Sequence, residues 1–385
     1  MIYHIGKSAF SFSAFITSFS PIVKKDRNAF ALKETSSLPE IEVSKLNTNY
    51  ILKISPSVTF LSTAAPFFIW NGFSNRQAYF QTRIPVSPAE YSRAFNLNNH
   101  CPAGSSVTFI TDSDFIDLKI TIKKILNSQI TSLYSSAGVD IYEKTAYGEH
   151  WLGCYAPINE LQTTFKCKLM HFHENPHEIT IYLPAFAQIQ LLQVGVQSNS
   201  HLYQPTAPQK RIAIYGSSIT QGCACSRPGL SYSNLLSRRL NCGIYNFGFS
   251  GSARGEIEIA QYIASLDLSA IVLEYDHNVD ILTLENTHYN FYSVLRQNQP
   301  HIPIIMFSRT SGGLSISCEE EQIRYGIIQA TFDRAKQNGD SNVFLLRGDT
   351  FFVDKEKYFV DDRHPNDHGM NVISQKLFEV LNTLI

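Results

Sequence analysis

The hydrophobic pattern of this chain changes near residue 210, and no other feature of the sequence limits the fold as strongly. Beyond this point, short apolar runs alternate with helical stretches. The apolar runs cover residues 211–215, 243–247, 270–275, 302–307 and 342–346. Alternation of strands with helices is typical of an α/β layer. We therefore predict a mostly parallel sheet with packed helices in the C-terminal half.

Two of the helical stretches carry clear signals. One helix is predicted from about Glu319 to Gln337, with three acidic residues in its first turn and Gly339 just past its end. The other, from Met370 to Leu384, repeats apolar residues along one helix face. In open parallel sheets, ligands bind beyond the carboxyl ends of the strands. The residues that follow the apolar runs are therefore the first place to look for chemistry.

The preceding part of the chain, from about residue 50 to 196, has the pattern of β-strands. Short β-type stretches include Ser106–Thr111, Ile116–Ile122, Glu178–Leu183 and Gln188–Val194. Apolar residues alternate within the second of these stretches, which places one apolar face on a sheet. Long helical patterns are scarce here. Because such sheets bury their apolar faces against each other, we predict an antiparallel β-sandwich or jelly roll.

The length of the chain also favours two domains. A single compact domain rarely reaches 385 residues. We predict a β-sandwich domain over residues 41–200 and an α/β domain over residues 208–385, with an N-terminal segment, residues 1–40, outside both. Residues 197–210 contain Asn, Ser, Gln and two Pro, and we predict that they form the linker.

The composition is that of a globular protein. Hydrophobic residues make up 44% of the chain, charged residues 17%, and the net charge is -1, so neither disorder nor a polyanion-binding surface is indicated. Nucleic acid is not expected as a partner. The seven cysteines contain no CxxC pair and no Cys/His spacing suited to a metal, and we therefore expect reduced thiols.

The N-terminal 25 residues contain an apolar run from Ala9 to Val23 that serines interrupt. A signal peptide has a more continuous apolar region and a small-residue cleavage site, so this run is at most a weak export signal. We expect a cytoplasmic protein. No later segment approaches 18 uninterrupted apolar residues, and no membrane span is expected.

A serine follows the first apolar run of the C-terminal half. The sequence there is Gly216-Ser217-Ser218-Ile219-Thr220-Gln221-Gly222. Small residues allow a tight turn between a strand and the next element, and such a turn presents a hydroxyl together with backbone amides that an anion can approach. Taken alone, Gly-Ser-Ser indicates an ordinary turn, because Gly and Ser are common in turns.

Three further blocks stand near later strand ends or the C-terminus. They read Asn246-Phe247-Gly248-Phe249-Ser250-Gly251, Glu274-Tyr275-Asp276-His277-Asn278 and Asp361-Asp362-Arg363-His364-Pro365. In order and approximate position, the four blocks together resemble those of the SGNH/GDSL hydrolase family. The resemblance covers Arg211 to about Ile373 and implies a flavodoxin-like, three-layer catalytic domain that hydrolyses esters.

The resemblance also implies roles for individual residues. Ser218 matches the nucleophile. Three residues match the oxyanion hole: Ser218 itself, Gly251 through its N–H, and Asn278 through its side-chain amide. His364 matches the general base and Asp361 the carboxylate that orients it. A serine hydroxyl needs such a base, the base needs an orienting carboxylate, and the developing oxyanion needs fixed donors. This chemistry requires neither a cofactor nor a metal.

Two positions depart from the common family pattern. Ser217 stands where the family usually has an Asp before the nucleophile, and Asp276-His277-Asn278-Val279 replaces Gly-x-Asn-Asp. Neither departure removes a reacting group. The first alters the hydrogen bonding expected around the turn, and the bulkier Asp276-His277 pair is expected to narrow the acyl pocket. The identity of the substrate is therefore less constrained than the type of reaction.

A second resemblance concerns the β-rich part. Ala137-Gly138-Val139-Asp140-Ile141-Tyr142 resembles the Gly-x-Asp-Leu-Tyr signature of a β-rich domain that precedes the catalytic domain in a subgroup of SGNH esterases. Two readings of the signature are open. Asp140 and Tyr142 either fix a turn against the catalytic domain, which we favour because a buried Tyr needs a hydrogen-bond partner, or contact the substrate.

Other candidate residues have competing interpretations. His277 and His368 are rival general bases to His364. His171, His173 and His177, with Glu174, either bind a metal or, as we favour, belong to a solvated hairpin loop. Arg254 and Glu256 either bind a polar substrate or form a helix-start pair.

The sequence therefore predicts a serine esterase that removes a small acyl group, such as acetyl, from a polar carrier such as a carbohydrate. The partner is then a small-molecule or carbohydrate ester. One alternative is an acyltransferase with the same triad, in which a sugar hydroxyl replaces water. Another is a carbohydrate-binding protein without activity, although such a protein has no reason to retain all of the five site residues.

Overall fold

The computed structural model describes residues 38–73, 82–85, 91–126, 128–311 and 318–385. Leu38–Ile385 forms one compact unit. The apolar run from Ala9 to Val23, and with it residues 1–37 of the predicted N-terminal segment, lies outside the described residues. Within the described part, no helix combines the length and the apolar character needed to cross a lipid bilayer.

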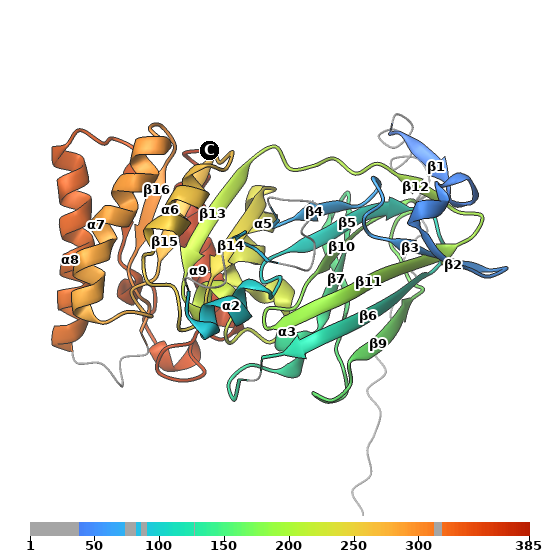
Figure 1. The fold of residues 1–385 in the computed structure, drawn as a ribbon, viewed down its shortest axis with the longest axis horizontal. Helices are drawn as coiled ribbons and strands as arrows, with labels where there is room; N and C mark the ends of the chain where they lie inside the picture. Colours follow the sequence, from blue (N-terminus) through green and yellow to red (C-terminus); the bar gives the residue numbers. More distant parts are fainter. Residues whose placement is uncertain (1–37, 74–81, 86–90, 127, 312–317) are drawn as a thin grey trace, which may run out of the picture. The chain divides into compact units, whose positions relative to one another are not determined.

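The first part of the compact unit consists mainly of strands (Figure 1). Its strands are β1 Glu40–Glu42, β2 Ile51–Ile54, β3 Val58–Ser62, β4 Ile69–Asn71, β5 Ser106–Thr111, β6 Ile116–Ile125, β7 Val139–Thr145, β8 Gly148–Tyr155, β9 Thr164–Leu169, β10 His177–Tyr182, β11 Ala187–Gln197 and β12 His201–Tyr203. Its α-helices are the short α2 Arg93–Asn99 and α3 Leu133–Ala137. We call this part, residues 38–203, the β-rich part.

The strands of the β-rich part form two antiparallel sheets. One sheet has the order β1-β12-β5-β10-β7-β8, with β4 also paired to β5, and the other has the order β2-β3-β11-β6-β9. Residues from both sheets share one hydrophobic core, among them Phe109, Ile181 and Val194. In β6 the buried residues alternate from Ile116 to Ile122, so the predicted apolar face is confirmed.

The remaining part, residues 211–385, alternates strands with helices. Its strands are β13 Arg211–Gly216, β14 Gly243–Gly248, β15 Ala270–Glu274, β16 Ile304–Phe307 and β17 Val343–Leu346. Its α-helices are α4 Ser218–Gln221, α5 Tyr232–Leu240, α6 Ile257–Ala264, α7 Ile281–Asn298, α8 Cys318–Gln337 and α9 Asp367–Leu381. The strand order is β14-β13-β15-β16-β17, and every one of these pairs is parallel. Among the strands of the described residues antiparallel pairs nevertheless predominate, because both other sheets are antiparallel.

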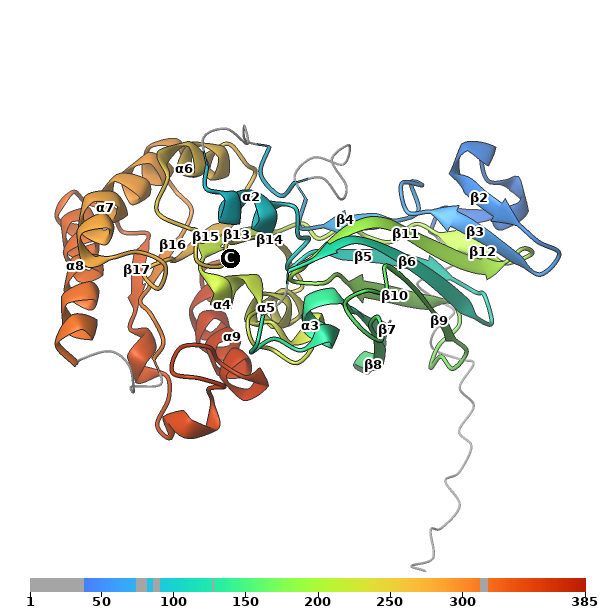
Figure 2. The same cartoon turned by 60° about the horizontal axis from the view of Figure 1, so that its bottom comes forward.

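Helices cover both faces of the parallel sheet (Figure 2). Tyr215 and Leu273 point to the face that α6, α7 and α8 cover, whereas Ile214 and Val272 point to the face of α5 and α9. Successive strand residues thus contribute to two separate cores, as the alternation of side chains in a strand requires. The arrangement leaves the carboxyl ends of the strands at one edge, where the predicted site residues follow β13, β14 and β15.

The structure corrects two details of the sequence analysis. The predicted linker, residues 197–210, contains β12, which pairs with β1 and β5 and so belongs to a sheet. The last helix begins at Asp367 instead of Met370, because the Asn366 side chain accepts hydrogen bonds from the backbone N–H groups of His368 and Gly369 and caps the helix.

Six of the seven cysteines are free, and the side chain of Cys318 is outside the described atoms.

Candidate active site

The predicted nucleophile lies at the turn between β13 and α4. Gly216 ends the strand, and a Cβ atom there would come within 2.1 Å of Thr220 Oγ1, so only glycine fits. Ser217 caps the helix, because its Oγ accepts from the backbone N–H of Ile219 at 3.1 Å. Ser218 is then the first residue of α4, where backbone N–H groups have no partner in a preceding turn.

The structure brings Ser218 together with His364 and Asp361. Ser218 Oγ lies 2.9 Å from His364 Nε2, and His364 Nδ1 lies 2.8 Å from Asp361 Oδ2. The side chains form a chain of hydrogen bonds from the hydroxyl to the carboxylate. With Asp361 accepting at Nδ1, the imidazole carries its proton on that nitrogen and presents Nε2 as an acceptor to the serine.

Asp361 and His364 come from one short loop before α9. The loop closes on itself, because the backbone N–H of Val360 donates to the His364 carbonyl oxygen and Phe359 bridges Pro365. Burial alone would raise the pKa of Asp361, but hydrogen bonds from the backbone N–H groups of Arg363 and His364 lower it below its ordinary value. The carboxylate therefore stays ionised.

Asn278 and Gly251 contact each other beside the nucleophile turn. The Gly251 N–H donates to Asn278 Oδ1 at 3.2 Å, and Asn278 Nδ2 donates to the Phe249 carbonyl oxygen at 2.9 Å. These two bonds fix the orientation of the amide, since the reverse orientation would place donor against donor and acceptor against acceptor. One hydrogen of Nδ2 thus remains for another acceptor, whereas the Gly251 N–H already has a partner.

His277 is not placed as the general base. Its side chain is only 5% exposed, and its Nε2 lies 3.8 Å from Glu274 Oε1, beyond hydrogen-bond distance. Arg309 Nη2 lies 3.3 Å from its Nδ1. Burial, with the positive charge of Arg309, holds the pKa of His277 well below its ordinary value. His368, the other rival, lies in the first turn of α9 and is held there through its backbone N–H.

Glu274, the last residue of β15, was quoted in the sequence analysis without a role. It lies behind the nucleophile turn with 1% of its surface exposed. Its carboxylate accepts from the backbone N–H of Ser217 at 3.1 Å, from Ser217 Oγ at 2.9 Å and from Thr220 Oγ1 at 2.7 Å. Burial raises the pKa of Glu274 to about 7 in spite of these donors.

Glu274, Asp276 and His277 bring three possible metal-ligand atoms within 4.8 Å of one another. Their chemistry does not favour a cation. The Glu274 oxygens already accept from Ser217 and Thr220, and Asp276 Oδ2 accepts from the backbone N–H of Arg309 at 3.0 Å. Two positive charges, those of Arg309 and Arg324, act on Asp276 as well. We therefore assign no metal to this group.

The β-rich part reaches the loop that carries Gly251. Asn98, in α2, donates through Nδ2 to the Ser250 carbonyl oxygen at 2.9 Å, and Gln221 Nε2 lies 3.2 Å from Asn98 Oδ1. Gln221 Oε1 accepts from the Ser250 N–H at 2.8 Å. Arg83 is fully buried and donates to the carbonyl oxygens of Asn246 and Gly248. No motif marked Asn98 or Arg83, because their partners are distant in sequence.

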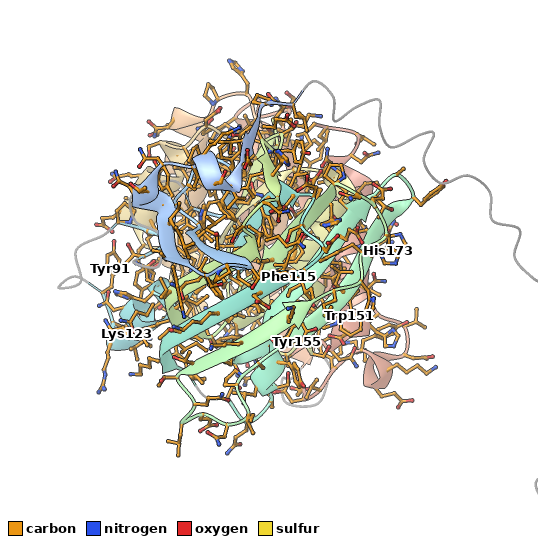
Figure 3. The ribbon with its side chains drawn as sticks, turned by 90° about the vertical axis from the view of Figure 1, so that its right-hand side faces the viewer. Tyr91, Phe115, Lys123, Trp151, Tyr155 and His173 are labelled. Carbon is orange, nitrogen blue, oxygen red and sulfur yellow. The ribbon has the colours of Figure 1, made fainter. Side chains whose placement is uncertain are left out.

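Asp140 joins the β-rich part to the segment after α4. It is fully buried and accepts from Arg227 Nη1 at 2.8 Å, from Trp151 Nε1 at 2.8 Å and from the Gly229 N–H at 2.9 Å. Tyr142 accepts from Arg227 through its hydroxyl. These contacts agree with the reading in which the signature fixes a turn against the following part of the chain. Trp151 lies on the edge strand β8 and is labelled in Figure 3.

The prediction of a hairpin loop for the histidine cluster is wrong, because the segment after β9 leads to β10 in the other sheet, and the two strands do not pair. His177 is buried in β10, and its ring nitrogens lie 2.5 and 2.8 Å from the carbonyl oxygens of Glu174 and Ser113, so neither faces an open ligand position. His173, labelled in Figure 3, lies 2.6 Å from Glu143 through Nδ1. At the other candidate pair, Glu256 is the N-cap residue of α6, but its carboxylate makes no capping bond and accepts instead from the Arg254 N–H and the Tyr215 hydroxyl.

Two family models match the chain. Residues 209–382 match the GDSL-like Lipase/Acylhydrolase family, and residues 69–202 match GxDLY, described as the N-terminus of SGNH-hydro-type esterases. The C-terminal part is a GDSL-like lipase/acylhydrolase domain. Both resemblances inferred from the sequence are thereby confirmed. Comparison with curated proteins gives no match.

Solved structures share the fold of this GDSL-like chain. A Bacteroides ovatus ATCC 8483 protein described as a GDSL-like lipase aligns with a TM-score of 0.77 at 24% identity, covering 85% of this chain and 98% of that one. A salicylyl-acyltransferase from a tetracycline biosynthetic pathway aligns with 0.71 at 14% identity, covering 86% and 98%. A family two carbohydrate esterase from Clostridium thermocellum, solved with cellohexaose, aligns with 0.54 at 16% identity, covering 73% and 93%.

Proposed function

We propose that this GDSL-like protein is a serine esterase that hydrolyses a small acyl ester of a carbohydrate, with Ser218 as nucleophile. The hydrogen-bond chain Ser218–His364–Asp361 carries the proposal, because it supplies a hydroxyl, a base and an orienting carboxylate in reacting order. The division into a β-sandwich domain over residues 41–200 and a catalytic domain over residues 208–385 belongs to the same proposal.

In the first half of the reaction, Ser218 Oγ attacks the ester carbonyl carbon while His364 Nε2 accepts the hydroxyl proton. Asp361 stabilises the imidazolium through Nδ1–H. The negative charge develops on the former carbonyl oxygen, which the backbone N–H of Ser218, the free hydrogen of Asn278 Nδ2 and the Gly251 N–H receive. The Gly251 N–H must turn away from Asn278 Oδ1, or be shared with it, to do so.

The tetrahedral species then expels the alcohol, which takes the proton from His364 Nε2, and leaves an acyl group on Ser218. In the second half, His364 deprotonates a water molecule that attacks the acyl-enzyme. Collapse returns the proton to Ser218 Oγ and releases the carboxylic acid. No cofactor or metal enters this scheme.

The carbohydrate substrate is supported by the fold neighbours, which include carbohydrate esterases and an acetyl xylan esterase from Butyrivibrio proteoclasticus. An acyltransferase is the second candidate, since the salicylyl-acyltransferase aligns over 98% of its length. In that case a sugar or other hydroxyl replaces water in the second half-reaction. A binding protein without activity is the third candidate.

The decisive experiment measures release of acetate and p-nitrophenol from acetylated sugars and p-nitrophenyl esters, with and without added sugar acceptors. An esterase releases acid at a rate independent of the acceptor, whereas an acyltransferase forms a new ester. Loss of all turnover in Ser218→Ala, with retained folding, is expected. A wild-type protein that releases no acid, forms no ester and still binds the sugar would favour the third candidate.

A further inference from the structure

The turn that carries Ser218 is hydrogen-bonded to one buried carboxylate, that of Glu274. Glu274 lies at the end of β15, next to β13 in the parallel sheet, and its side chain points across to the turn. It accepts hydrogen bonds from the backbone N–H and the hydroxyl of Ser217, the residue directly before the nucleophile. The two bonds bind both the main chain and the side chain of Ser217 to a neighbouring strand.

The same carboxylate holds the first turn of α4. Thr220 donates its hydroxyl hydrogen to Glu274 Oε2 at 2.7 Å, so the Tyr232 hydroxyl, 2.6 Å away, must donate to Thr220 Oγ1. Ser217 Oγ in turn accepts from the Ile219 N–H. The Ser217 hydroxyl thus accepts from the Ile219 N–H, the Thr220 hydroxyl accepts from Tyr232, and both donate to Glu274. Glu274 is therefore the one acceptor that orients the network.

The residues around the turn are also buried from solvent. Ser217, Thr220 and Tyr232 have no exposed surface, and Glu274 has 1%. A Cβ atom on Gly216 would meet Glu274 Oε2 at 2.7 Å. Because Ser217 and Thr220 have no contact with solvent, the carboxylate serves as the acceptor for both hydroxyls. The position of Ser218 therefore depends on the Glu274 side chain, although the two residues are not in contact.

From this network we infer that Glu274 is a positioning residue, which supplies from β15 the carboxylate that the family's common pattern places at position 217. The inference rests on the proposed function, because it concerns the same nucleophile. It also accounts for the departure at Ser217: a small hydroxyl residue caps α4 and leaves room for the carboxylate of the neighbouring strand. Glu274 acts through Ser217 and Thr220 and has no contact with the reacting atoms.

A double-mutant cycle that moves the carboxylate from position 274 to position 217 tests this inference. Glu274→Gln removes the charge and keeps one acceptor oxygen, which can stay at the Oε2 position for Thr220 and the Ser217 N–H. It replaces Oε1, 3.0 Å from Ser217 Oγ, by an amide donor. Ser217→Asp alone brings two buried carboxylates together. The double variant Ser217→Asp/Glu274→Gln restores one carboxylate and one donor in a complementary pair, because Asp also caps helices.

At pH 8, above the pKa of about 7 at which Glu274 ionises, we expect Glu274→Gln to lower kcat by about 100-fold with KM nearly unchanged, since a small displacement of a nucleophile has effects of this size. Ser217→Asp should lose activity as well, and the double variant should recover at least about tenfold over Glu274→Gln. The rate at which a fluorophosphonate labels Ser218 should follow the same order. Glu285→Gln, an exposed carboxylate on α7, is the matched control and should leave kcat unchanged.

Circular dichroism and thermal unfolding establish that each variant is folded. A Glu274→Gln variant with wild-type kcat and labelling rate would overturn the inference alone, and so would a double variant that only accumulates the two losses. If Glu274→Gln does not fold, the folded double variant with measurable kcat supports the inference, and failure of both to fold assigns Glu274 to stability instead. A wild-type protein that neither turns over an ester nor is labelled would overturn the proposed function as well.

Discussion

His364 Nε2 lies 2.9 Å from Ser218 Oγ, although 146 positions separate the two residues in the chain. Ser218 follows β13, which lies between β14 and β15 in the parallel sheet, and His364 comes from the loop before α9. Each residue is held separately: the serine by its turn, the histidine by Asp361 and by the bond from Val360. The pair therefore forms from two locally ordered segments that the sheet and α9 bring together.

The first prediction concerns the triad. Ser218→Ala and His364→Ala should each lower kcat by at least about 10⁴-fold, because one removes the proposed nucleophile and the other its proposed base. Asp361→Ala should cost less, since the carboxylate orients the imidazole and forms no bond to substrate. Steady-state kinetics with a p-nitrophenyl ester measures all three. His301→Ala, at an exposed histidine, is the control. Equal losses at Asp361 and His364 would contradict the assigned roles.

The second prediction concerns the amide beside the turn. Asn278→Ala should lower kcat by about 100–1000-fold with a smaller change in KM, because the donor acts mainly on the transition state. It also frees the Gly251 N–H from Asn278 Oδ1, so part of the loss reflects a less ordered loop. Asn290→Ala, on the exposed face of α7, provides the comparison. Wild-type kcat in Asn278→Ala would remove this residue from the oxyanion site.

The third prediction concerns the contact between the β-rich part and the segment after α4. Asp140→Ala leaves Arg227, Trp151 and the Gly229 N–H without their shared acceptor. Removal of one partner from a buried ion pair costs about 3 kcal/mol, and we expect the free energy of unfolding to fall by this amount. Denaturant unfolding measures it. Asp267→Ala removes a carboxylate whose side chain is 96% exposed and should change stability by less than about 0.5 kcal/mol.

The fourth prediction is a pH dependence of stability due to Glu274. Burial raises its pKa from 4.5 to about 7 in the folded protein. Between these values the folded chain binds a proton that the unfolded chain has lost, so stability falls as pH rises through this range. The groups that face Glu274 are Ser217, Thr220 and His277, with the Asp276 charge nearby.

Unfolding free energies of the wild type and Glu274→Gln, measured between pH 4 and pH 8, test this prediction. The difference between them should decrease by up to about 3 kcal/mol from pH 4.5 to 7 and stay level outside that range. Taking the difference cancels the titrations that both chains share, including that of His288, whose pKa burial lowers to about 4. A difference that rises with pH would show that the folded state favours the ionised carboxylate.

Much of the fold was accessible from local patterns. The strands β5 and β13 and the helix α8 lie within a residue or two of their predicted ranges, because alternation, apolar runs and acidic first turns act over short distances. β12 was missed, since a three-residue strand in a segment of Ser, Gln and Pro has no pattern of its own. It exists because β1 and β5 flank it and supply its hydrogen bonds.

The candidate site was likewise predictable from the sequence only in part. The residue types in the four sequence blocks, through their resemblance to the SGNH/GDSL family, identified Ser218, Gly251, Asn278, Asp361 and His364 as candidates without any structure. Their hydrogen bonds, the burial of Glu274 behind the turn and the contact from Asn98 were decided only by the tertiary structure. The physical reason is that a strand end specifies a residue's local geometry, whereas its partners depend on which strand becomes its neighbour. The order β14-β13-β15 places Asn278 and Glu274 beside Ser218, and no local pattern encodes that order.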